Sequence, residues 1–387
     1  MSATSNATPE DQYVANPNIV ERWAAAYLQA HGASRDSHLH ALDSDEFRAL
    51  RRLERSTMSW AAAAGALSGG IIGGLELLVF RGLLNGVDAA AWEDQWPYWA
   101  AFLAIAGVIS VVEIGYLYWN VLRSVGKLSR ITGASLEGGP YATLTLRGLT
   151  RTALEVPNPR SRVYGIDPYA LVPRWKFVAQ NIFYRMKVGL SSFILRVLFR
   201  HVLARTALRG FIPLLTGPLY AVWNVWITRR IMRHAREQAL GPFTVEDLVR
   251  EVVTQRPHLG PRARRAIVQG VGELMVRNQD AHPNYVYLLA RLMEALAMPD
   301  RTIDLDWAER RRDLPHLTAP ERLTLLRTLA VASVLGGKLR KGQLELLQEA
   351  YSTLGMSLQR SLVKELRSRL MSGQRITADD VRLAAPA

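Results

Sequence analysis

Two glutamates stand alone inside long apolar stretches, and they are the first candidates for chemistry in this chain. Glu76 is the single charged residue of Met58–Phe80. Glu113 is the single charged residue of Tyr98–Leu122. Each stretch is long enough to cross a bilayer core of about 30 Å as a helix that rises about 1.5 Å per residue. Because an ionisable group inside a membrane is costly, it marks a functional or packing site.

The two glutamates differ in their expected depth. Glu113 lies about ten residues before Arg123, which is roughly 15 Å along a helix and deep in the hydrocarbon. Ser68 falls at a similar depth in the first stretch, so we expect Glu113 to face that stretch and to hydrogen-bond near Ser68. Glu76 lies near the outer end, close to Arg81, where its carboxylate reaches the headgroups. A structural hydrogen bond is favoured for Glu113 over ion or proton handling, because relays usually need several acids.

Small residues recur every four positions along the first apolar stretch, in two neighbouring rows. The rows are Ala61, Gly65, Gly69 and Gly73, and Ala62, Ala66, Gly70 and Gly74. In lipid such a face lets helices approach closely, and packing drives their association. Glycine is otherwise unfavourable in a helix, so this many glycines need a partner helix. Packing against the second stretch of the same chain is the favoured prediction, and assembly of a homo-oligomer is the alternative.

The charges that flank the apolar stretches predict their orientation. Basic residues precede the first stretch and follow the second, and they are Arg48, Arg51, Arg52 and Arg55, and Arg123, Lys127 and Arg130. The connecting loop carries Asp88, Glu93 and Asp94 against Arg81 alone. Because positive flanks stay in the cytoplasm, we predict a multi-pass protein with a transmembrane helical hairpin and with both termini cytoplasmic.

The net charge of +14 is unevenly distributed along the 387 residues. Residues 123–242 carry 19 basic and 4 acidic side chains, a net charge of +15. The predicted division is an N-terminal cytoplasmic helical segment at 1–57, the transmembrane hairpin at 58–122, a basic membrane-associated region at 123–242 and a C-terminal helical domain at 243–387. Basic residues beside a membrane are attracted to anionic lipids, which are the first expected partner. Nucleic-acid binding would rest on charge alone, and the apolar residues between the arginines favour lipid instead.

The apolar segments of the basic region are too charged or too broken for an ordinary span. Phe177–Leu208 carries several arginines among aliphatic residues, so we expect an interfacial helix with snorkelling arginine stems. Phe211–Ile227 is uncharged but is interrupted by two prolines, and arginines follow it. The number of crossings within Val188–Ile227 is therefore even, and a re-entrant or interfacial pair is preferred to a second hairpin. The residues expected to contact anionic lipid are Arg196, Arg200, Arg205, Arg209, Arg229, Arg230 and Arg233.

Residues 243–387 have the pattern of a soluble-like helical bundle. Apolar residues recur with helical spacing in Arg262–Val276, Tyr285–Leu296, Ala319–Leu335, Leu344–Leu354 and Leu358–Leu370. Acids follow Thr244 and Thr377, a pattern that predicts a helix start at each threonine. The whole chain is predicted to be all-α, with a transmembrane hairpin, basic interfacial or re-entrant helices and a cytoplasmic bundle.

Four stretches of the chain carry a family resemblance. They are ALEVPNP (Ala153–Pro159), GIDPYALVPRWK (Gly165–Lys176), YRMKVGLSSFILR (Tyr184–Arg196) and PLYAVWNVWITRRIMRHAREQALGP (Pro218–Pro242). This region resembles an uncharacterised bacterial integral membrane protein family, whose core is similar to EcsC-type proteins through a Gly/Pro–apolar–Asn–Arg–Arg pattern. The resemblance implies the bacterial inner (cytoplasmic) membrane. It also implies an accessory role, because EcsC-type proteins are associated with an ABC exporter operon, but no activity.

A second resemblance covers about forty residues near the C-terminus. Leu323–Met356, with the sequence LTLLRTLAVASVLGGKLRKGQLELLQEAYSTLGM, resembles a TerB-like domain. That family places an Asp-Gly pair at a helix junction and an acid several residues later, and these residues can bind a metal. Here Gly336 stands at the Asp position and Gln343 at the acid position, so the resemblance implies the fold without the metal site. A generic helical hairpin with a glycine turn explains the stretch equally well.

Other site chemistry lacks support in the sequence. The chain has no cysteine, which excludes thiolate nucleophiles, disulfides and cysteine-ligated zinc. His38 and His40 form the closest pair among eight histidines and lack a third ligand, so no metal or cofactor is predicted. Gly336-Gly337-Lys338 lacks the remainder of a phosphate-binding loop. Enzymatic activity is therefore unsupported.

Two functions remain after these exclusions. The favoured one is a non-enzymatic integral membrane scaffold or accessory subunit, whose cytoplasmic helical domain binds a protein partner at the membrane surface. The alternative is an oligomeric channel or transporter subunit, assembled through the glycine-rich first span with Glu113 lining the path. Replacement of Glu113 by glutamine separates the two hypotheses, because it should be silent in a scaffold and should alter conductance in a pore.

Overall fold

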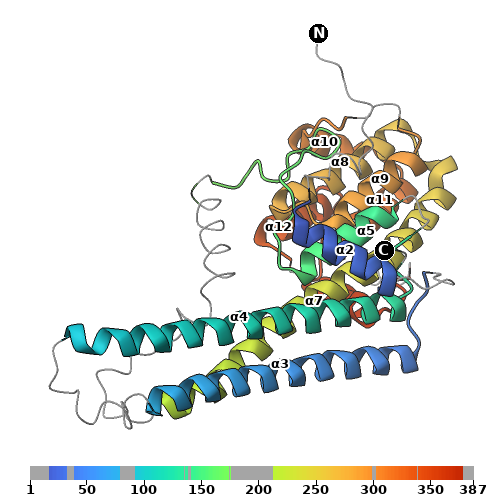
Figure 1. Ribbon diagram of the computed structural model, residues 1–387. Helices are drawn as coiled ribbons and strands as arrows, with labels where there is room; N and C mark the ends of the chain where they lie inside the picture. The colour runs from blue at the N-terminus through green and yellow to red at the C-terminus, as the bar shows by residue number, and fades with distance from the viewer. Residues whose placement is uncertain are drawn as a thin grey trace. The chain divides into compact units, whose positions relative to one another are not determined.

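The protein is all-helical in the part of the chain that the computed structural model describes (Figure 1). The described residues are 17–32, 39–78, 92–134, 136–137, 141–173, 175, 212–298, 302–337 and 339–377. Their helices are α2 (Ile19–Gly32), α3 (Ser44–Leu78), α4 (Trp92–Ile131), α5 (Ala142–Ala153), α7 (Ile212–Gln255), η3 (Arg256–His258), α8 (Pro261–Asn278), α9 (Pro283–Ala295), α10 (Trp307–Asp313), η4 (Leu314–His316), α11 (Ala319–Leu335), α12 (Lys341–Thr353) and α13 (Arg360–Ser372).

The chain divides into two compact units. Unit 1 comprises Met1–Arg51, Val125–Val172 and Arg233–Ala387, and unit 2 comprises Arg52–Ser124 and Pro173–Met232. Three long helices, α3, α4 and α7, contribute residues to both units. The units follow contacts in space and cut across the four segments expected from the sequence.

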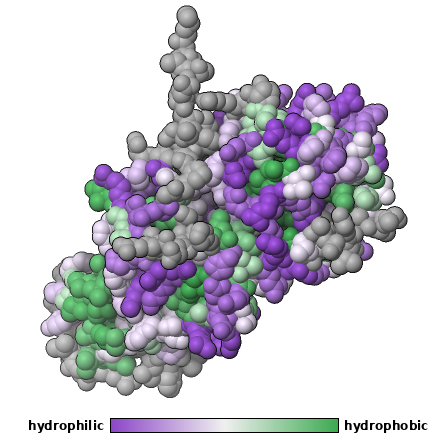
Figure 2. Space-filling model, turned by 90° about the vertical axis from the view of Figure 1, so that its right-hand side faces the viewer, coloured by the Kyte–Doolittle hydropathy of each residue, from purple (hydrophilic) through white to green (hydrophobic). Residues whose placement is uncertain are grey.

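Unit 2 contains the two helices that are long and apolar enough to cross a membrane, α3 and α4. The first part of α7 packs with them. Their shared core consists of Ile72, Phe102, Ala106 and Tyr220, with Leu75 and Ile109 packed against it. Large apolar side chains also lie on the outside of these helices, among them Leu67, Val108, Val111, Val112 and Val222. Figure 2 shows a large hydrophobic area at the lower left of the visible face and smaller ones among hydrophilic residues elsewhere.

Unit 1 is a bundle built around α8 and α11. Nearly all of α11 from Leu325 onward is buried, as expected for a helix that is apolar on every side. A capping box between Thr318 and Glu321 begins this helix, and the second Glu321 oxygen accepts from the Gly260 N–H at 2.8 Å. The five segments with helical spacing correspond to α8, α9, α11, α12 and α13, so the prediction of helices there is confirmed.

The predicted helix start at Thr244 is wrong. The helix α7 runs without a break from Ile212 to Gln255, and Thr244 is buried in its middle. Its hydroxyl donates to the Leu240 carbonyl at 3.5 Å, the back-bond of a threonine inside a helix. Asn284 packs against Gly241, and its amide nitrogen donates to the Glu237 carbonyl at 3.0 Å, so tertiary contacts hold the helix where a local signal suggested a start. The predicted start after Thr377 lies outside the described residues.

Candidate functional site

Glu113 is the centre of a small polar cluster inside unit 2. Its carboxyl group is almost fully buried among apolar residues. The Asn224 amide nitrogen donates to Glu113 Oε1 at 2.6 Å. The Ser68 side chain lies close to the same carboxyl group, and its hydroxyl donates to the Gly65 carbonyl at 3.3 Å. The same Asn224 nitrogen lies 3.4 Å from the Ala61 carbonyl oxygen. One acid, one amide and one hydroxyl therefore join α3, α4 and α7 at a single level.

The cluster is small for a transport pathway. Among the described residues, Glu113 Oε2 is buried and accepts no hydrogen bond, so the carboxyl group retains one unused acceptor or one proton position. Relays and ion paths inside membranes usually use several ionisable groups in succession. A single carboxyl that accepts a hydrogen bond from a neighbouring helix is typical of a packing contact.

The two small-residue rows of α3 have different environments. Along the first row, an added Cβ on Gly65 would lie 2.5 Å from the Tyr220 carbonyl oxygen. An added Cβ on Gly69 would lie 2.6 Å from the Thr216 carbonyl oxygen. Ala61 and Gly73 of this row are also buried. The first row is therefore covered by α7 of the same chain, rather than only by the second apolar stretch as the sequence suggested.

The second row is open in the described part of the chain. An added Cβ on Gly70 or Gly74 would meet nothing within 4 Å. Ala66 and Gly70 are exposed, and Ala62 and Gly74 are half-buried. The broad smooth face expected from the sequence is thus split. The Cβ positions of the first row face α7, whereas those of Gly70 and Gly74 face open space, and the backbone at Ala66 and Gly70 lies beside Gly217.

Glu76 is buried on α3. The physical reason is helical periodicity, because Glu76 continues the buried face of α3 formed by Gly65, Gly69 and Ile72. Arg81, its expected neighbour, lies outside the described residues. The expected position of Glu76 close to Arg81 and the headgroups stays a prediction.

The expected lipid-contacting arginines are only partly described. Arg229, Arg230 and Arg233 are exposed on α7. The others, Arg196, Arg200, Arg205 and Arg209, lie with Phe177–Leu208 outside the described residues. For Phe211–Ile227, the structure shows a helix from Ile212 onward that packs along α3. The number of membrane crossings there stays a prediction.

A second buried acid, Glu237, organises the core of unit 1. Its side chain is 1% exposed, with Arg367 Nη2 2.9 Å from Oε1 and His234 Nδ1 3.3 Å from Oε2. Burial alone would raise the pKa of this carboxyl, but the nearby His234 ring, with the charge and hydrogen bond of Arg367, lowers it below its ordinary value. Gly337, at φ +83°, packs directly against Oε2, where a side chain would collide.

The metal position that the TerB-like resemblance would supply does not fit this chain. Gly336, at the Asp position, packs against the Tyr285 ring and Asn278, which leaves no room for a carboxylate. Gln343, at the acid position, donates to the Tyr285 hydroxyl at 2.6 Å. Among the described residues, no group of three or more His, Asp or Glu side chains could hold a metal ion. Glycine and glutamine thus occupy the two positions where the family has its acids.

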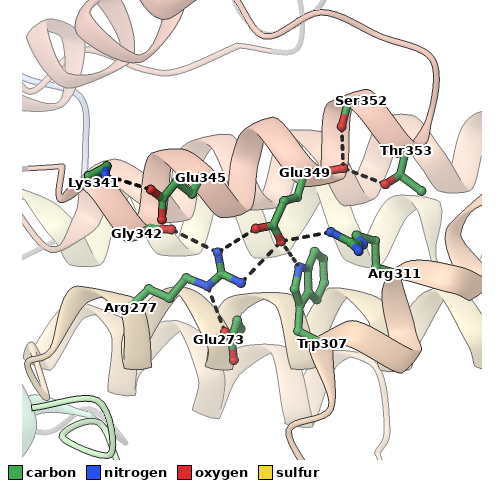
Figure 3. Close-up of polar contacts among 10 residues, drawn as sticks. All are labelled: Glu273, Arg277, Trp307, Arg311, Lys341, Gly342, Glu345, Glu349, Ser352 and Thr353. Carbon is green, nitrogen blue, oxygen red and sulfur yellow. Dashed lines mark hydrogen bonds and ion pairs between the residues drawn. The ribbon is translucent and has the colours of Figure 1, made fainter.

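The charged network around Arg277 joins α8, α10 and α12 (Figure 3). Arg277 Nε donates to Glu273 at 2.9 Å, and its Nη1 donates to Glu349 at 3.2 Å. The Trp307 indole N–H also donates to Glu349, at 3.2 Å. Burial alone would lower the pKa of Arg277, but these two carboxylates raise it above its ordinary value. Because the charges satisfy one another, the network is suited to holding the bundle together.

Sequence reasoning missed Asn224, Glu237 and Glu349. Asn224 is the only amide in the uncharged stretch Phe211–Ile227, and that isolation was the available signal. Glu237 is the only acid in the basic residues that follow, Arg229–Pro242. Glu349 carries no such signal, because it lies on an ordinary amphipathic helix.

Replacing Glu237 by glutamine should lower the free energy of unfolding at pH 7 by about 1–3 kcal/mol, because Arg367 loses its buried partner. The folded pKa of Glu237 lies below its ordinary value of 4.5, so its contribution is present above pH 4.5 and is lost as the pH falls below it. The acid sensitivity of unfolding should therefore be weaker in E237Q than in the wild type. Chemical denaturation between pH 3 and pH 7, roughly the range that brackets this titration, measures both effects.

Glu345→Gln is the matched control, because Glu345 pairs with Lys341 on the surface. Its effect on the free energy of unfolding should stay below about 1 kcal/mol at every pH. An acid sensitivity in E237Q equal to that of the wild type would contradict the assigned role of Glu237.

Alanine substitutions along α3 should separate its two glycine rows. Gly65→Ala should lower the thermal unfolding midpoint in detergent, because its Cβ would press on the Tyr220 backbone; the cost is about 1–3 kcal/mol. Gly70→Ala meets open space and should leave the midpoint unchanged or raise it, since alanine is favoured over glycine in a helix by about 1 kcal/mol. Equal destabilisation by both changes would mean that the open row also has a partner.

The comparisons with known proteins found no similar protein. No protein-family model, no curated protein and no solved structure matches the chain. The EcsC-like and TerB-like resemblances therefore stay predictions, and the evidence for function is the geometry of the two units.

Proposed function

We propose that this protein is a non-enzymatic membrane scaffold or accessory subunit. Unit 2 is embedded in the bacterial inner membrane, and unit 1 binds a protein partner on the cytoplasmic side. Membrane embedding is supported by two helices of sufficient length and apolarity and by the exposed aliphatic side chains of unit 2. The basic flanks of α3 and α4 support cytoplasmic termini.

The observation that carries the scaffold proposal is the contact of α7 with both Glu113 and the first small-residue row of α3. Asn224 bonds Glu113, while the backbone at Thr216 and Tyr220 lies against Gly69 and Gly65. A channel would need the first small-residue row at a subunit interface and Glu113 along a path. Here both contact α7 of the same chain. An acid bonded in this way stabilises helix packing.

Partner binding by unit 1 is supported by the outer face of α2. The inner face of this helix, including Ala24 and Leu28, is buried in unit 1. Ile19, Val20 and Trp23 are exposed on its other side, and adjoining exposed apolar residues are typical of interaction surfaces. The Trp23, Tyr27 and His31 rings stack in a row along the helix, with centroids 6.2 Å and 4.4 Å apart.

The alternative of an oligomeric channel or transporter subunit retains one supporting observation. The second small-residue row, around Gly70 and Gly74, is open in the described residues and could receive a helix of another copy. In that arrangement the unused Oε2 of Glu113 would have to lie beside a conducting path, which the burial of this atom disfavours.

Glu113→Gln should be silent under the scaffold proposal, because glutamine keeps the size and one carbonyl acceptor for Asn224. Wild-type and E113Q proteoliposomes should both show no proton or potassium flux above protein-free vesicles, and their thermal midpoints should agree. Glu113→Leu should lower the stability by about 1 kcal/mol, since the Asn224 amide is left without its acceptor. Flux assays and thermal unfolding measure these outcomes.

The double variant E113L/N224L provides the control for these substitutions. Replacing both polar partners by apolar residues should cost less than the two single changes together. Ion flux through the wild type that E113Q removes would contradict the scaffold and favour the channel.

A further inference from the structure

Exposed arginines gather at one end of unit 2. All three of its described helices contribute, with Arg55 on α3, Arg123 on α4, and Arg229 and Arg230 on α7. We call this set the arginine collar. None of the four makes a salt bridge with another described residue.

The contacts between the helices put the collar at one level. The Asn224 amide lies against the Ala61 carbonyl, and α3 and α7 run antiparallel there, because Gly65 meets Tyr220 one turn further along. Arg55 lies six residues before Ala61, and Arg230 lies six residues after Asn224. Both are therefore roughly 9 Å from this contact in the same direction.

Hydrogen bonds between α3 and α4 bring Arg123 to the same level. The Thr57 hydroxyl donates to Ser124 Oγ at 2.8 Å, and the Asn120 amide donates to the Thr57 carbonyl at 3.1 Å. Arg123 is the neighbour of Ser124, and Arg55 is two residues from Thr57. The collar thus surrounds the end of the three-helix packing.

Three exposed tryptophans accompany the collar. Trp60, Trp119 and Trp226 have 59%, 43% and 52% of their surface exposed. Each lies about one helical turn from a collar arginine of its own helix. Trp60 follows Arg55, whereas Trp119 and Trp226 precede the arginines of α4 and α7, so all three lie toward the apolar middle of unit 2. A tryptophan on every helix beside the charged end is the arrangement found where a protein passes from hydrocarbon to headgroups.

The charge of the collar is only partly balanced. Glu54 is the one acid of the described unit 2 residues at this level, and it is half-buried and has contacts of its own. Guanidinium groups bind phosphate oxygens through two parallel hydrogen bonds, so four of them above a tryptophan belt match a layer of phosphodiesters. Zwitterionic headgroups would leave the positive charge unneutralised.

We propose that the arginine collar binds the phosphate groups of anionic phospholipids in the surrounding bilayer, with Trp60, Trp119 and Trp226 seated at the interface. This inference rests on the membrane embedding proposed for unit 2, and it adds the class of lipid and the residues that select it. The occupant is a membrane lipid and not free phosphate, because the tryptophans contribute an apolar contact that an inorganic ion cannot use.

The test uses the full-length protein purified in detergent, with added phosphatidylglycerol, phosphatidylcholine or inorganic phosphate. Phosphatidylglycerol should raise the thermal unfolding midpoint, whereas phosphatidylcholine and phosphate should not. In the variant R55Q/R123Q/R229Q/R230Q the apparent affinity for phosphatidylglycerol should fall by at least about tenfold, because the attraction of each arginine to an anionic surface is lost. The control R262Q/R265Q/R312Q/K364Q removes the same charge from exposed positions of unit 1 and should behave like the wild type.

Three outcomes would overturn the proposal. They are an unchanged phosphatidylglycerol effect in the collar variant, an equal loss in the control variant, or the same stabilisation by inorganic phosphate alone. If the quadruple variant does not fold, the pairs R55Q/R123Q and R229Q/R230Q decide, and each should lose part of the affinity. Failure here leaves the flux result with Glu113 untouched, so the collar and the scaffold proposals can fail separately.

Discussion

The hydrogen bond from Asn224 to Glu113 is the constraint on which the arrangement of unit 2 depends. A carboxyl group among apolar helices is costly unless polar groups contact it, and α3 supplies only Ser68. The amide that completes the contact lies on α7, 111 residues away in sequence. For Asn224 to reach Glu113, α7 must pack closely along α3, and the absence of a Cβ at Gly65 and Gly69 makes that approach sterically feasible.

The helices α3, α4 and α7 each contribute residues to both units, and the packing at Glu113 orders the parts of them that belong to unit 2. Within unit 1, buried charges are matched inside the fold, as Glu237 is by Arg367 and Arg277 is by Glu349. The polar groups at Glu113 and the charge pairs at Glu237 and Arg277 are thus used for packing, which is the basis of the scaffold proposal.

Much of the fold could be predicted from the sequence because its signals are local. Length and apolarity indicated α3 and α4, and helical spacing indicated the five helices of the C-terminal bundle. Thr244 misled because a capping pattern reports only its own neighbours, whereas the continuation of α7 depends on Asn284 packing against Gly241.

The candidate site was predictable in part for the same reason. Glu113 and Ser68 could be found from depth along two helices, which needs only the rise per residue. Asn224 could not be placed beside them, because its helix is interrupted by prolines in sequence and its contact is distant along the chain. The burial of Glu76 was not predicted, because its depth was considered without the direction of its side chain, which helical periodicity sets toward the buried face.

The central claim is that unit 2 is embedded in the membrane with unit 1 in the cytoplasm. Cysteine accessibility tests this claim most directly. The chain contains no cysteine, so a single introduced cysteine is the only thiol of the protein that the reagent can label. With a membrane-impermeant thiol reagent, Asp88→Cys should be labelled on intact cells, Gln374→Cys only after permeabilisation, and Val222→Cys, on the exposed apolar side of α7, under neither condition. Labelling of Gln374→Cys on intact cells, or of Val222→Cys as readily as Gln374→Cys after permeabilisation, would contradict this account.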